Sequence, residues 1–203
     1  MLSVLKAFLP TPKIRTLAAL QQFLEREAAH LAQRSVLDFM RNELGNLSPH
    51  AFGDPAYQAR LAISRWEGFV AILADMTVLA QVRLLETGVP RAALDARLGD
   101  LYGAILAGHP VPAHRTQDWA DDIAALRTRL TKRPAGPASP QADAEATGAK
   151  IFDTLPFTPR DPVENRMVLA NAFAFGLIAF NDRLRRLLVV APLRDELLVA
   201  SPQ

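Results

Sequence analysis

The chain has 203 residues, half of them hydrophobic, which excludes global disorder and provides enough apolar side chains for one domain with a substantial core. Its 23 lysines and arginines nearly balance 21 aspartates and glutamates, so the net charge of +2 predicts no nucleic-acid partner. Cysteine is absent, which excludes disulfides and thiolate chemistry and favours a cytoplasmic location.

The first ten residues, MLSVLKAFLP, have the spacing of a short amphipathic helix. They lack the apolar run and the small-residue cleavage site of a secretory signal. Such a segment can dock on its own domain, on a partner protein or peripherally on a membrane surface. The predicted partner-binding residues here are Leu2, Leu5, Phe8 and Leu9.

A first long helix is predicted from Pro12 to about Leu44, where Gly45 ends it. Apolar residues recur along it at spacings of three and four, with charged residues between them. This pattern is typical of a surface helix packed on a core by one face. The turn-rich stretch 46–53 then connects it to the next helix.

The second long helix, Asp54 to Gly88, is expected at the centre of the fold. Asp54 can cap the first turn, and Pro55 suits the first helical position. Between residues 68 and 80 the only polar side chains are Asp75 and Thr77, and a helix that is apolar on all sides is buried. A buried Asp75 would need a partner such as an arginine or a hydroxyl group.

Two shorter helices are predicted next, at residues 90–107 and 117–132, the second of them capped by Thr116. Residues 134–150 are rich in proline, alanine and small polar residues, so they are expected to form a linker or a long surface loop. The short apolar stretch 151–157 is expected to return to the core.

A last long helix begins at Asp161-Pro162, the same start signal as in the central helix. From 167 to 180 its only polar residue is Asn171, which predicts a second buried helix. The apolar run is too short for a membrane span, which needs about 20 residues. Arg183 and Arg186 follow it and are predicted to bind a partner.

These elements predict an all-α fold: a single bundle of about five to six helices with two long, strongly apolar central helices. Residues 1–133 would form the N-terminal part, 134–150 the linker or loop, and 151–203 the C-terminal helix that completes the same bundle.

Signals for chemistry are weak, and no cofactor is predicted. Glu27 and His30 have the Glu-x-x-His spacing of di-iron bundles, and Asp75 is the acid expected inside the core, but a second Glu-x-x-His is missing. Gly99 and Gly103 could admit a flat ring such as heme, although close helix packing explains them as well.

Two functions remain open. The first is a non-enzymatic helical interaction module, such as an adaptor, assembly factor or regulatory subunit, that acts through an apolar, arginine-edged surface on a protein partner or on a second copy. The alternative is a bundle that encloses a small apolar ligand or a heme or di-iron cofactor, with or without enzymatic activity, for which Glu27, His30 and Asp75 are the candidate residues.

Overall fold

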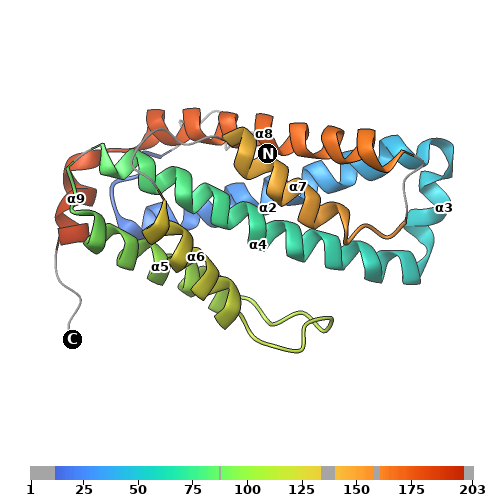
Figure 1. Ribbon diagram of the computed structural model, residues 1–203, viewed down its shortest axis with the longest axis horizontal. Helices are drawn as coiled ribbons and strands as arrows, with labels where there is room; N and C mark the ends of the chain where they lie inside the picture. Colours follow the sequence, from blue (N-terminus) through green and yellow to red (C-terminus); the bar gives the residue numbers. More distant parts are fainter. Residues whose placement is uncertain (1–11, 87, 134–139, 158–160, 199–203) are drawn as a thin grey trace, which may run out of the picture.

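The computed structural model describes residues 12–86, 88–133, 140–157 and 161–198. Within these ranges the protein is all-α, as predicted, with eight α-helices and no strand (Figure 1). The helices are α2 (Leu17–Leu44), α3 (Ser48–Gly53), α4 (Pro55–Leu85), α5 (Arg91–Ala107), α6 (Ala120–Lys132), α7 (Pro140–Phe152), α8 (Pro162–Leu187) and α9 (Val190–Leu198).

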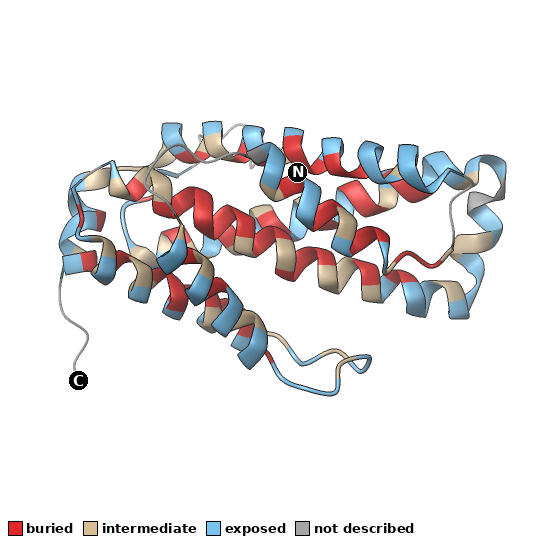
Figure 2. Cartoon of the chain, viewed as in Figure 1, coloured by how far each residue is buried: buried red, intermediate tan, exposed pale blue. Residues whose placement is uncertain are grey.

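Helix α4 is the centre of the bundle. It contacts α2, α5, α6, α7 and α8, and fifteen of its residues are buried (Figure 2). Asp54 caps it as predicted, with its side chain accepting a hydrogen bond of 2.9 Å from the Ala56 backbone N–H, and Pro55 occupies the first turn. The prediction of a buried central helix is therefore confirmed.

Helix α2 starts later than predicted, at Leu17 rather than at Pro12. The reason is a parallel β-bridge between Ile14 and Leu188, in which the Ile14 N–H donates to the Leu187 carbonyl at 2.9 Å. Extended residues cannot belong to a helix, so the helix begins only after Thr16, whose hydroxyl caps it.

Two other boundaries differ slightly from the prediction. The stretch 46–53 contains the short helix α3 in addition to turns. Helix α6 begins at Ala120 instead of Gln117: Trp119, not Thr116, is at the N-cap position, and the Asp118 side chain before it accepts from the Ala120 N–H at 2.9 Å.

The prediction of a linker or loop at 134–150 is wrong for residues 140–150, which belong to helix α7, while 134–139 lie outside the described residues. Helix α7 packs against α8 and α4. Its small residues permit a close approach: a Cβ at Gly148 would lie 2.9 Å from the Ala170 Cα. The alanines and glycine that resembled a linker are therefore the contact surface of a helix pair. The return of residues 151–157 to the core is confirmed, since Ile151 and Leu155 are buried.

The prediction of a second buried helix is wrong for half of α8. Its inner face is buried, but the opposite face is exposed because α8 lies at the edge of the bundle, where the structure places α7, α2 and α4 on one side only. By length and composition, both α4 and α8 could cross a membrane; 72% of the apolar window of α4 is buried in the bundle but only 33% of that of α8. Core helices of soluble proteins have the same length and composition.

Candidate interaction site

The outer side of α8 carries a row of exposed apolar residues. Phe175 is 73% exposed and Val163 75% exposed, values that leave most of each side chain in water. The other exposed apolar side chains of this helix are Met167, Val168 and Ile178. We call these five residues the outer face of α8. Several exposed apolar side chains on one side of a helix are a feature of interaction sites, and here the exposed polar residue among them is Asn171.

The outer face follows the helical period and has a charge at each end. Glu164 precedes Phe175 by about three turns and Arg186 follows it by about three turns, so all three lie on one line along the helix. Glu164 and Arg186 are both exposed. The face is thus acidic at one end, apolar in the middle and basic at the other end.

A hollow of about 390 Å³ lies beside Phe175, between α8 and α2. Gly176 brings the two helices close together at this point, since a Cβ there would collide with the Leu31 side chain. The small residues Ala172 and Ala179 line the α8 side of the hollow. They leave room beside the Phe175 ring for a side chain from outside.

The predicted partner-binding arginines lie at the basic end of α8. Arg183 turns towards α2 and forms an ion pair with Glu27, whereas Arg186 is exposed and its backbone carbonyl accepts from Lys13 Nζ at 2.7 Å. The Arg186 side chain thus lies exposed at the end of the outer face, where its Nε donates to the Asp182 backbone carbonyl at 3.4 Å. The other predicted partner-binding residues, Leu2, Leu5, Phe8 and Leu9, lie outside the described residues.

The three candidate cofactor residues are not brought together. Glu27 pairs with Arg26 at 3.3 Å and with Arg183, His30 is exposed at the edge of the hollow, and Asp75 is buried on α4. In the ranges that the structure describes, no group of three or more side chains could hold a metal ion.

Asp75 has the partners that its burial requires. The Thr147 hydroxyl donates to it at 2.6 Å and Arg129 Nη2 lies 2.7 Å away, while Arg129 also pairs with Asp143 at 2.8 Å. Burial raises the pKa of Asp75 to about 6, although Arg129 and Thr147 act in the opposite direction. These contacts join α4 to α6 and α7, as expected for a structural ion pair.

A second charged cluster surrounds Glu67 on the same helix. Arg115 donates to both carboxylate oxygens at 2.8 Å, and His114 Nε2 lies 2.9 Å from one of them. Burial alone would raise the pKa of Glu67, but these hydrogen bonds dominate and lower it to about 2. Arg115 also lies over the Trp119 ring, 4.7 Å from its centroid. The cluster fastens the segment between α5 and α6 to α4.

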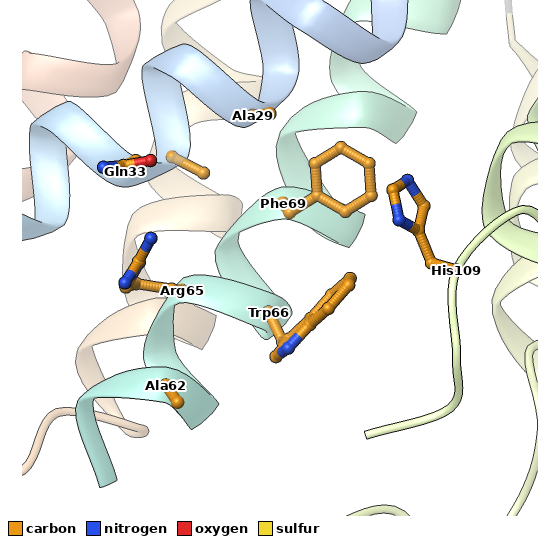
Figure 3. Close-up of a pocket in the computed structure, with 8 residues that line it drawn as sticks. Ala29, Gln33, Ala62, Arg65, Trp66, Phe69 and His109 are labelled. Atoms are coloured by element: carbon orange, nitrogen blue, oxygen red, sulfur yellow. The ribbon is translucent and has the colours of Figure 1, made fainter. Parts of the chain in front are cut away.

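An aromatic pocket of about 280 Å³ lies between α2 and α4 (Figure 3). Trp66, Phe69 and His109 stand on one side of it, with ring centroids 5.3 to 6.0 Å apart, and Gln33 and Arg65 lie on the other. His109 Nε2 lies 3.0 Å from the Glu25 carboxylate. The sequence gave no signal that His109, which is distant in the chain, lies beside Trp66.

The two glycines of α5 serve helix packing. A Cβ at Gly103 would lie 3.4 Å from Ile123 Cδ1, and one at Gly99 would lie 2.9 Å from Arg127 Cγ. Helix α6 therefore fills the space that a flat ring would need.

The comparisons with known proteins give no family and no relative for this fold. No family model matches the chain, and neither a curated protein nor a solved structure matches it significantly.

Proposed function

We propose that this protein is a helical interaction module rather than an enzyme, and that the outer face of α8 is its docking surface. The observation that carries the proposal is the 73% exposure of Phe175 in the middle of a helix whose other face is core. An exposed phenylalanine of this kind has an energetic reason to be covered, since burying an aromatic side chain contributes about 1.5–3 kcal/mol.

The surroundings of Phe175 fit this role. The hollow between α2 and α8 can receive an apolar side chain, and the exposed Glu164 and Arg186 can orient a partner. Together they form an apolar centre with a charged rim, the usual arrangement of a protein interface.

The test compares two variants that each place one glutamate on an exposed apolar position. Phe175→Glu changes the outer face, whereas Val111→Glu changes a residue of the α5–α6 segment that is 43% exposed. Tagged wild type and both variants are used to capture partners from the native cells, with circular dichroism as the check on folding.

Proteins held by the wild type and by Val111→Glu should be lost from Phe175→Glu. Equal capture by all three baits would rule out the outer face of α8 as the docking surface.

The aromatic pocket supports the second candidate function, a bundle that holds a small apolar or aromatic ligand. Trp66 and Phe69 provide an apolar wall, and Gln33 and Arg65 provide polar groups that could orient a ligand. Native mass spectrometry with a visible absorption spectrum tests it: an added mass that disappears in Trp66→Ala would support a ligand in this pocket, and the bare chain mass would count against it.

A further inference from the structure

Resting on the proposed function, we infer that the partner of the outer face of α8 is a second copy of this chain, bound with the two α8 helices antiparallel. The inference starts from the order of charges along the face: Glu164 at one end, Phe175 in the middle and Arg186 at the other end. A surface with this order is complementary to itself when one copy is turned end to end.

Phe175 lies midway between Glu164 and Arg186, so an antiparallel pair centred on Phe175 brings each Glu164 opposite the Arg186 of the other copy. The same axis places the two Phe175 side chains next to each other. A parallel pair would instead place Glu164 opposite Glu164 and Arg186 opposite Arg186, which like-charge repulsion opposes.

Two other charged residues near the face, Arg166 and Asp182, are compatible with this arrangement, and the exposed Arg185 adds to the positive charge at the end that carries Arg186. Arg166 is held within its own molecule by Asp153 at 3.0 Å and lies over the Phe152 ring. Asp182 is one turn from Arg186 on the same helix, where an acid four residues before a base is favourable.

The shape of the surface also fits a second copy. Beside Phe175 the small residues Ala172 and Ala179 border the hollow between α2 and α8. Across a two-fold axis, the Phe175 ring of each copy would enter the hollow of the other, and both exposed rings would be covered at once.

The experiment measures dimerisation of the full chain by light scattering and sedimentation. The wild type should be dimeric, and Phe175→Glu should raise its dissociation constant at least about thirtyfold, the size of effect expected at an interface hot spot. Val111→Glu, with its glutamate on another surface, should behave as the wild type does.

Charge reversal tests the orientation. Glu164→Arg and Arg186→Glu should each weaken the dimer, and the double variant should restore it because each new arginine again faces a glutamate of the other copy. A parallel pair would gain nothing from the double change, so failure of this rescue would overturn the antiparallel arrangement.

The absence of cysteine allows a second, independent test with single introduced cysteines. Phe175→Cys should form a disulfide with itself, whereas Val168→Cys should link only when mixed with Asp182→Cys. Val168→Cys linking with itself would indicate a parallel pair and overturn the inference.

The two levels of the proposal fail differently. A wild type that stays monomeric at the highest concentration overturns the second copy as the partner, but the docking surface stands if Phe175→Glu still loses captured proteins. If Phe175→Glu leaves the dissociation constant of the dimer unchanged, the inference is overturned. If this variant also captures the same proteins as the wild type, the docking surface is overturned as well.

Discussion

Helices α4 and α8 begin with the same sequence signal but differ in how much of their surface is buried. Each starts with an aspartate followed by proline, each contains a long apolar run, and each is long enough to cross a membrane. Helix α4 is surrounded by its neighbours in the bundle, whereas α8 lies at the edge and leaves its outer face in solvent. The difference shows that the sequence of a helix gives the amount of its apolar surface. How much of that surface is buried within one molecule depends on the helices packed around it.

The sharpest contrast lies within α8 itself, between two phenylalanines on opposite faces. Phe173 is fully buried, while Phe175 is 73% exposed. Phe173→Ala should destabilise the fold by about 3–5 kcal/mol, because it removes buried apolar surface and leaves a cavity. Phe175→Ala should change stability by less than about 0.5 kcal/mol in the monomer.

Urea denaturation, at a protein concentration low enough to keep the chain monomeric, measures both values. Similar large losses for the two variants would mean that the outer face is packed within its own molecule, and the contrast between α4 and α8 would disappear.

The elements with strong local signals could be predicted from the sequence. The Asp54-Pro55 and Asp161-Pro162 starts and the apolar periods located both long helices correctly. Helix α7 could not be predicted, because its alanines and Gly148 show no apolar periodicity. Their role is the close packing of α7 on α8, at the Ala170 backbone, which the sequence of α7 alone does not show. Helix α2 was predicted to begin too early, because the bridge between Ile14 and Leu188 joins distant parts of the chain.

The candidate site was predicted in part. Arg186 at the basic end of α8 was indicated by its position after an apolar run. The exposure of Phe175 was not, because residues 167–180 of α8 are apolar on both sides of the helix except for Asn171. The positions of α2, α4 and α7 decide which side of α8 faces solvent.

Helix α4 also contains a buried carboxylate, Asp75, and its pKa gives the second prediction. Its pKa is raised to about 6 in the folded protein, so the folded state binds this proton more tightly than the unfolded chain does. Stability from this group is greatest below the unfolded pKa, near 3.8, and is lost as the pH rises through about 6.

Asp75→Asn removes this titration but keeps a hydrogen-bond acceptor for Thr147. The free energy of unfolding of the wild type should therefore fall relative to that of the variant by about 2 kcal/mol between pH 4 and pH 7, because the pKa of Asp75 is about two pH units higher in the folded protein than in the unfolded chain. Urea denaturation over this range measures the difference. A difference that does not change with pH would show that Asp75 ionises alike in the folded and unfolded states.

The smallest expected effect concerns the shared start of the two helices. Asp161 accepts from two backbone N–H groups, those of Val163 and Glu164, at 3.1 and 3.0 Å, whereas among the described residues the Asp54 side chain accepts from Ala56 alone. Asp161→Ala should therefore cost about 1 kcal/mol and Asp54→Ala somewhat less, while asparagine at either position should be nearly neutral because it caps equally well.

Thermal and urea denaturation of the four variants measure this order. Since the first turns of both helices are exposed, burial contributes little to either value and the caps are compared directly. A larger loss for Asp54→Ala would show that the central helix depends on its first turn more than the edge helix does. The number of capping hydrogen bonds would then not explain the difference in stability between the Asp54 and Asp161 variants.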